Sequence, residues 1–117
     1  MKWLLLVALS FTGCQSQALF DCADTIKKEL VSPDGRYVAL VFDRDCGATT
    51  KVSTQIVIRE AAKRVDLKEA SPVLVVKEAS EIALMWDSPG ALTIDLPEDA
   101  ETYTKRDAWQ GIQIDYR

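Results

Sequence analysis

The residues best suited to chemistry gather between positions 43 and 53, around Cys46 and Gly47. Polar groups anchored beside a cysteine and a glycine suit recognition, so this segment is a candidate contact loop. The alternative is structural: the acidic and hydroxyl side chains satisfy loop backbone groups, while Gly47 supplies an unusual backbone angle. We favour this alternative, because these residue types form turns in any protein. The candidate contact residues are Asp43, Arg44, Asp45, Thr49, Thr50 and Lys51.

Catalysis by this segment is the weaker interpretation, because the chain contains no histidine. A serine or cysteine nucleophile usually needs a neighbouring base, and histidine is the commonest one. Lys51 near Ser53 is too little to indicate a Ser–Lys dyad. We therefore predict no catalytic residues, and keep as the alternative a small hydrolase or accessory enzyme that uses residues 43–53.

Metal binding is also not expected. The run Asp43-Arg44-Asp45 is similar to the start of a calcium loop, but the third ligand, the glycine and the closing glutamate are out of register. A zinc site would need histidine or more free cysteines. The acidic run at Glu98, Asp99 and Glu101 is typical of a solvated loop. We predict no metal and no cofactor.

The N-terminus indicates export. Residues 1–13 combine Lys2, an apolar run at 3–9 and small residues before a cleavage site, as in a secretory signal peptide. The apolar run is too short to span a bilayer, which takes roughly 20 apolar residues. Phe11-Thr12-Gly13-Cys14 resembles the lipobox of bacterial lipoproteins, in which the cysteine is lipidated and becomes the first mature residue. The alternative is ordinary cleavage after Ala18, which would leave a soluble periplasmic or secreted protein.

The resemblance to lipoproteins implies a location. Cys14 would carry the lipid, and residues 14–21 would form the lipidated N-terminus and a tether. Several acyl chains hold a protein firmly on a membrane, whereas a single chain does not. Gln15 follows the cysteine in place of an aspartate, which by similarity to the Gram-negative sorting rule favours the outer membrane, facing the periplasm.

Charge and cysteine count agree with an exported domain. The formal net charge of −4 argues against nucleic acid as a partner, because nucleic acid binding needs a basic surface. With Cys14 set aside, Cys22 and Cys46 remain as an even pair in an oxidising compartment. A disulfide between them would stabilise the domain by about 3 to 4 kcal/mol, and we prefer it to a catalytic thiol.

The rest of the chain predicts a mainly β fold. We expect residues 22–117 to form one antiparallel β-sheet domain, as a meander, sandwich or half-barrel of six to eight short strands. A short helix within 60–70, or an edge strand at 64–67, is an option. The expected strands are 26–30, 36–42, 53–59, 72–76, 81–86, 91–96 and 111–116, with turns at 32–35 and 88–90.

The strand at 36–42 is expected to be central. Its sequence, RYVALVF, is apolar on both faces, which favours a strand covered on both sides. Among the tryptophans, Trp86 alternates into a core face. Trp109 lies in a polar stretch and is the candidate for an exposed contact.

Three motifs carry a further resemblance: Ser32-Pro33-Asp34-Gly35, RDCGATT at 44–50 and STQ at 53–55. Together they resemble a family of small uncharacterised bacterial lipoproteins and exported proteins. The similarity extends through 86–96 and 111–116, and so covers most of the domain. It implies a compartment and an architecture, and no activity.

We therefore expect a non-enzymatic, lipid-anchored envelope protein. It would bind another protein or a cell-wall component, and an immunity protein or inhibitor is one concrete version. A small acidic domain that is crosslinked by a disulfide fits that role.

Overall fold

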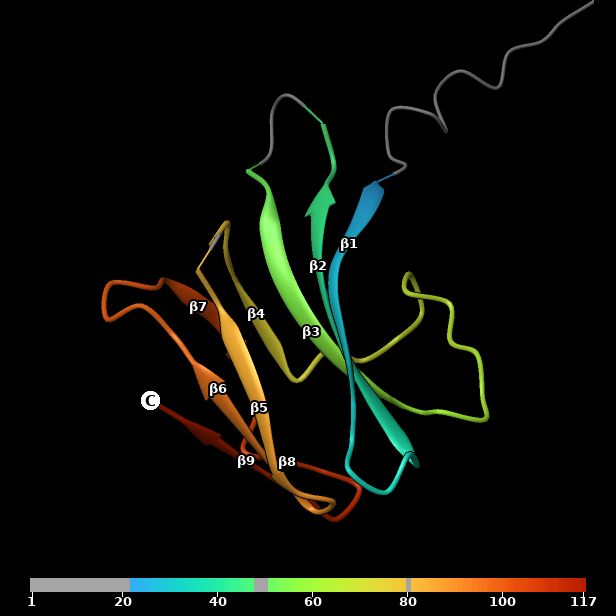
Figure 1. Cartoon of the computed structure of the whole chain (residues 1–117). Coiled ribbons are helices and arrows are strands. Elements are labelled where there is room, and N and C mark those ends of the chain that lie inside the picture. Colours follow the sequence, from blue (N-terminus) through green and yellow to red (C-terminus); the bar gives the residue numbers. More distant parts are fainter. Residues whose placement is uncertain (1–21, 48–50, 80) are drawn as a thin grey trace, which may run out of the picture.

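The computed structural model describes residues 22–47, 51–79 and 81–117, and regular structure within them is entirely β (Figure 1). Two sheets pack face to face as a sandwich, which confirms the mainly β prediction. The optional short helix is wrong, since 61–72 is irregular. Among these residues, no helix is long and apolar enough to cross a membrane. The predicted signal peptide, Cys14 and the tether to residue 21 lie outside the described residues.

The larger sheet has five strands in the order β1-β2-β3-β4-β7, and each neighbouring pair is antiparallel. Its first three strands follow one another along the chain, as expected of a meander. The last, β7, was predicted as a loop because it is short and polar. The bounds are β1 Ala23–Val31, β2 Tyr37–Asp45, β3 Ser53–Glu60, β4 Leu74–Lys77 and β7 Thr102–Lys105.

The smaller sheet has four strands in the order β5-β6-β9-β8. Strands β6 and β9 pair in parallel, so the prediction of a purely antiparallel domain is wrong at this point. The chain reaches β9 from β6 by way of β7, in the other sheet, and a long return of this kind allows a parallel pairing. The bounds are β5 Ala83–Ser88, β6 Ala91–Asp95, β8 Ala108–Trp109 and β9 Ile112–Tyr116.

The main core lies between the two sheets. Alternate residues of β2, β3, β4, β6 and β9 point into it, as the period of two along a strand requires. In the strands expected at 53–59 and 111–116, the alternating isoleucines are the residues that face this core. The buried members are Ala39, Val41, Ile56, Ile58, Val73, Leu74, Val76, Ile82, Leu92, Ile94, Ile112 and Ile114.

A second, smaller core lies on the opposite face of the five-stranded sheet, which we call the outer face. It is covered by residues 61–72, here called the covering segment, through Leu67 and Ala70. Figure 1 shows this segment on the side of β1 and β2 away from the second sheet. Strand β2 is therefore covered on both faces, as its sequence predicts. The buried residues of this outer core are Val38, Leu40, Phe42 and Val57.

The turn between β1 and β2 follows from its sequence. Gly35 has a φ of 74°, in the region that glycine enters without a steric penalty. Its N–H donates to the carbonyl oxygen of Ser32 over 2.9 Å. The Ser32 hydroxyl and the Arg36 N–H both donate to the carboxylate of Asp34, and these bonds lower the pKa of Asp34. The turn thereby fixes the register of the first hairpin.

Tryptophan side chains join elements that are distant in sequence. Trp86 of β5 donates its indole N–H to the carbonyl oxygen of Leu30 in β1 over 2.9 Å. Trp109 packs edge-on against Tyr37, with ring centroids 6.0 Å apart, and lies against the main core. The prediction of Trp109 as an exposed contact is therefore wrong, because the polar residues around it flank a side chain that turns inward.

Cys22 and Cys46 form a disulfide just beyond the point where Ala23 pairs with Asp45. The bond closes the open end of the first hairpin, opposite the turn at Gly35. It is compatible with an oxidising compartment.

Replacing Cys22 and Cys46 together with alanine should lower the free energy of unfolding by about 3 kcal/mol, because the unfolded chain regains the freedom of a closed loop. Urea unfolding followed by tryptophan fluorescence measures the change, in a Cys14→Ser background that removes the third thiol. A reductant should weaken the parent by a similar amount and leave the double variant unchanged. Rapid alkylation of both sulfurs in the folded, unreduced parent would contradict the bond.

Candidate functional site

The predicted contact loop begins later than the sequence suggests. Asp43, Arg44 and Asp45 are the last three residues of β2 and not loop residues. The ladder continues through them because Arg44 pairs with Asp24 on one side and with Ser53 on the other. Thr49 and Thr50 lie outside the described residues.

Arg44 makes three hydrogen bonds that tie separate elements together. Its Nε and Nη2 donate to the two carboxylate oxygens of Asp24 over 2.8 and 3.0 Å, and Nη2 also donates to the carbonyl of Leu67 over 2.9 Å. The bonds to Arg44 lower the pKa of Asp24 and raise the pKa of the guanidinium. The guanidinium also lies 5.4 Å from the ring centroid of Phe42. Arg44 thus joins β1, β2 and the covering segment.

The neighbouring candidates have similar local partners. Asp43 accepts a hydrogen bond from the Thr54 hydroxyl over 2.7 Å and faces the Lys27 ammonium at 3.4 Å. Asp45 accepts from the backbone N–H of Gly47 over 3.0 Å. These contacts agree with the structural alternative for Asp43, Arg44 and Asp45.

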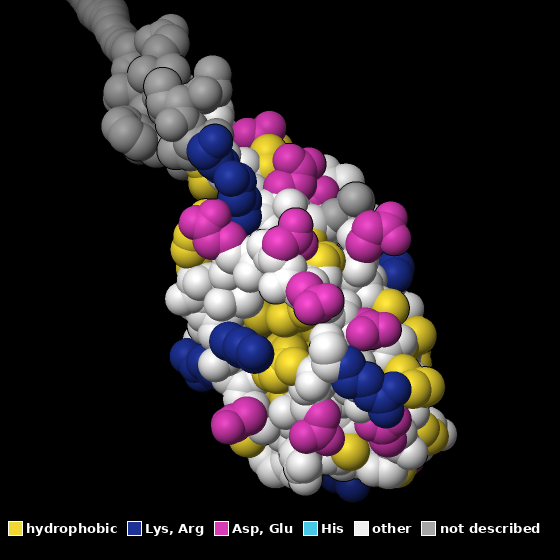
Figure 2. All heavy atoms as spheres, turned by 90° about the vertical axis from the view of Figure 1, so that its left-hand side faces the viewer, with side chains coloured by type: hydrophobic (Ala, Val, Ile, Leu, Met, Phe, Trp, Pro, Cys, Tyr) yellow, Lys and Arg dark blue, Asp and Glu magenta, His cyan; other side chains and the backbone are white. Residues whose placement is uncertain are grey.

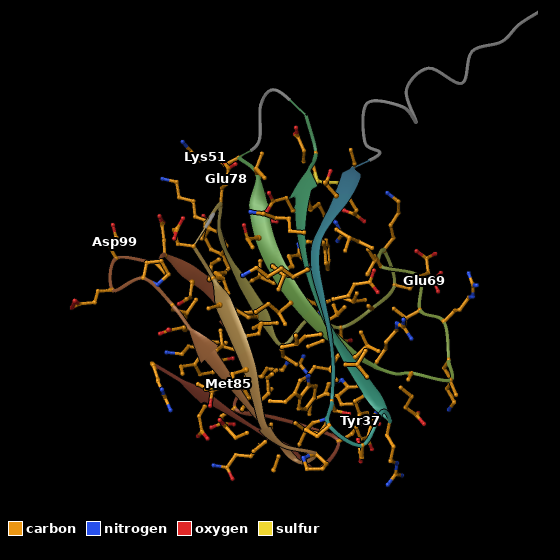
Figure 3. All side chains as sticks on the ribbon, in the orientation of Figure 1. Tyr37, Lys51, Glu69, Glu78, Met85 and Asp99 are labelled. Atoms are coloured by element: carbon orange, nitrogen blue, oxygen red, sulfur yellow. A yellow bond between two sulfur atoms is a disulfide. The ribbon has the colours of Figure 1, made fainter. Side chains whose placement is uncertain are left out.

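Lys51 lies apart from these contacts. Its side chain is exposed and points outward at the end of the sheet where Glu78 also lies (Figure 3). The chain beside it is held by a hydrogen bond from the N–H of Glu78 to the carbonyl of Val52, 2.9 Å long.

A groove on the outer face is the concave feature nearest to Arg44, and we call it the outer groove. It lies between the covering segment and strands β1 and β2, and has a volume of about 470 Å³. Such a volume is within the range of ligand and side-chain pockets. Glu69 marks the covering segment in Figure 3, on the side of the sheet away from Met85 of β5. The groove is lined by Ile26, Glu29, Leu40, Arg59, Ala61, Arg64, Val65 and Leu67.

Strand pairing explains the floor of the outer groove. Residues directly opposite each other in a sheet point to the same face. The pairs Ile26 with Phe42 and Glu29 with Leu40 therefore place two β1 side chains on the outer face. Val31 pairs with Val38 and joins the same face. A shift in register between Ile26 and Lys28 keeps both Ile26 and Glu29 there.

Hydrogen bonds hold the wall of the outer groove in place. The Nη1 of Arg59 donates to the carbonyl oxygens of Glu60, Ala61 and Lys63 over 3.1 to 3.2 Å. The Lys68 ammonium donates to the carbonyl of Cys22 over 2.5 Å. Together with the bond from Arg44 to Leu67, these contacts fix an irregular segment against the sheet without a strand or helix of its own.

The outer groove is also where apolar side chains reach the surface. Five large hydrophobic side chains of the described residues are exposed, and three of them, Ile26, Val31 and Val65, belong to the outer face or the covering segment. Several apolar side chains exposed together mark an interaction site more often than scattered ones do. The sequence interpretation missed this groove. The alternation Arg64-Val65-Asp66-Leu67 was its signal in the sequence, and the edge strand that it offered as an option is not formed.

A second cleft, of about 460 Å³, lies beside the turn at 97–101 and is mainly acidic. The predicted acidic run contributes Asp99 and Glu101, together with Glu78 and Glu81, and Lys77 is the one basic lining residue. Figure 2, viewed from the left of Figure 1, shows acidic side chains spread around an apolar area. Among the described residues, no group of three or more acidic, cysteine or histidine side chains has the arrangement of a metal site.

Comparison with known proteins found no matching family model, no matching curated protein and no matching solved structure.

Replacing Arg44 with alanine should lower the free energy of unfolding by about 2 to 3 kcal/mol at neutral pH, because the mostly buried carboxylate of Asp24 loses its partner. Chemical denaturation measures the loss. As a control, Glu101→Gln removes the exposed pair with Lys77, which is 4.0 Å long, and should cost less than about 0.5 kcal/mol.

The same pair predicts a pH dependence. The folded-state pKa of Asp24 is lowered, so its stabilisation is complete above the unfolded-state pKa of about 4 and is lost as the pH falls through the folded-state value. The difference in stability between the parent and Asp24→Asn should therefore shrink below about pH 4. A difference that stays constant down to the acid transition would contradict an ionic role.

Proposed function

We propose that this chain is a lipid-anchored protein of the bacterial envelope, and that its β domain is a non-enzymatic module that binds a protein partner through the outer groove. An immunity protein or an inhibitor of a secreted hydrolase is one form of such a module. The observation that carries the proposal is that the exposed apolar side chains of Ile26 and Val65 line one groove, and that Arg44, Arg59 and Lys68 hold its covering segment in place.

The contacts of the 43–45 residues support a binding role over an enzymatic one. Arg44 bonds to Asp24 and Leu67, and Asp43 bonds to Thr54, so these side chains already serve the fold. The chain has no histidine to act as a base. A small hydrolase that uses residues 43–53 is therefore the second candidate.

The anchor rests on Gly13 and Cys14 and on the resemblance to lipoproteins. A disulfide suits the same compartment, since such bonds persist outside the cytoplasm.

Replacing Cys14 with serine should release the protein from the membrane fraction, because the lipidated residue is gone. Fractionation of cells labelled with radioactive palmitate measures this, and the Cys22→Ser/Cys46→Ser chain, which keeps Cys14, should remain labelled. A soluble, unlabelled parent whose mature chain begins after Ala18 would instead establish ordinary cleavage.

Replacing Val65 with glutamate should weaken the complex with an envelope protein by at least about tenfold, since it places a charge in an apolar contact. Cross-linking in intact envelopes, identification of the partner and titration of the purified pair measure this. Tyr103→Glu is the control, because Tyr103 is another exposed large hydrophobic residue and lies on β7, at the edge of the sheet opposite β1.

Three outcomes would count against the proposal. The first is a partner that binds both variants equally, and the second is the absence of any partner that depends on Val65. The third is a cell-wall fragment that binds in place of a protein.

A further inference from the structure

The outer groove has an apolar floor and a basic side. Leu40 is almost fully buried at its base, whereas Ile26 and Val65 at its rim are 48% and 42% exposed. Arg59 and Arg64 line it on the side of β3 and the covering segment, and Glu29 lines it from β1. Two arginines and one glutamate therefore line the groove, on a chain whose net charge is −4.

The two arginines differ in their freedom to meet a ligand. Arg59 is engaged through Nη1 with three carbonyl oxygens of the adjacent turn, which fixes the direction of its side chain. Arg64 is exposed on the covering segment. A guanidinium presents a planar set of donors that matches a carboxylate, so a fixed and an exposed arginine together suit an acidic group.

The exposed edge of β1 is poorly suited to accept an added strand. The carbonyl of Leu30 accepts from Trp86, and the carbonyl of Cys22 accepts from Lys68. The register shift between Ile26 and Lys28 interrupts the strand between these points. Blocked carbonyls and bulges are the usual protections of an edge strand. A ligand would therefore be held by side chains in the groove and not by strand addition.

We propose that the outer groove takes an extended polypeptide segment in which a large apolar side chain lies next to a carboxylate. The apolar side chain packs on Leu40 between Ile26 and Val65, and the carboxylate meets Arg64, with Arg59 as the fixed charge behind it. The inference rests on the proposed function and adds the chemistry of the partner. The acidic surface around the 97–101 turn would repel the same segment, which directs it to the groove.

Titration of two short synthetic peptides against the full domain by fluorescence anisotropy tests this. One alternates leucine with glutamate, and the other has lysine at each glutamate position. The acidic peptide should bind the parent at least about tenfold more tightly than the lysine peptide, a difference of about 1.4 kcal/mol. Arg64→Glu should reverse this preference. Arg106→Glu, a charge-matched change of an exposed residue beyond β7, should leave it unchanged.

A second pair of measurements separates charge from packing. Val65→Ser should weaken binding of the acidic peptide without changing its preference over the lysine peptide. Added salt should weaken the parent's binding more than that of Arg64→Glu, because attraction between exposed charges is screened. Thermal unfolding of each variant shows whether the domain remains folded.

The inference is overturned if neither peptide binds, if both bind equally, or if a peptidoglycan fragment binds and the peptides do not. Failure here is distinguishable from failure of the proposed function. If an envelope protein binds in a way that depends on Val65 but not on Arg64, the proposed function stands. The acidic segment is then excluded as the ligand.

Discussion

Strand β2 carries apolar side chains on both of its faces, and the domain has to shield each face from water. Burying a side chain such as Leu40 or Phe42 contributes about 1.5 to 3 kcal/mol relative to leaving it exposed. The second sheet covers the inner face with regular strands. The outer face is covered by an irregular segment that supplies few apolar groups, Leu67 and Ala70 among them. Because the covering segment buries few apolar groups, hydrogen bonds from Arg44, Arg59 and Lys68 also hold it on the sheet.

Arg44 is central to that arrangement. A segment without secondary structure leaves backbone carbonyls unpaired, and a buried carbonyl without a partner is costly. Arg44 and Arg59 donate to carbonyls of this segment, and Lys68 within it donates to the carbonyl of Cys22. The covering segment thereby stays on the sheet with little apolar burial of its own. The disulfide contributes at the same end, because Cys22 provides the carbonyl that Lys68 bonds.

The outer groove is the consequence of this partial cover. The covering segment packs over Leu40, Phe42 and Val57 but leaves Ile26 and Val31 of β1 exposed. A helix or a third sheet would have buried them. Exposed apolar side chains beside a fixed wall are a liability for a monomer unless a partner covers them, and the proposed binding role of this face rests on that argument.

Much of the fold could be predicted from the chain, and most of the site could not. The apolar run at 36–42 and the alternation in 53–59 and 111–116 predict three strands, because these patterns lie in residues that are neighbours along the chain. Strands β7 and β8 were missed because β7 is short and polar and β8 has only two residues, and both depend on pairing with a neighbouring strand. Arg44 is among the candidate contact residues, but its partner Asp24 belongs to a different strand. The pairing register of β1 and β2 brings the two residues together, and their spacing along the sequence does not reveal it.

By itself, the sequence determined the mainly β class, the central place of 36–42 and the pairing of Cys22 with Cys46. The first two depend on residue types that lie close together in the chain. The third depends on the cysteine count, because only Cys22 and Cys46 remain once Cys14 is set aside. Only the tertiary structure decided that β6 and β9 run parallel, that Trp109 turns inward and that Arg44 links β1 to the covering segment. It alone placed Ile26, Arg64 and Val65 around one groove. Contacts between distant segments depend on how the strands pair and how the 61–72 backbone lies on them, and neither is encoded by local periodicity.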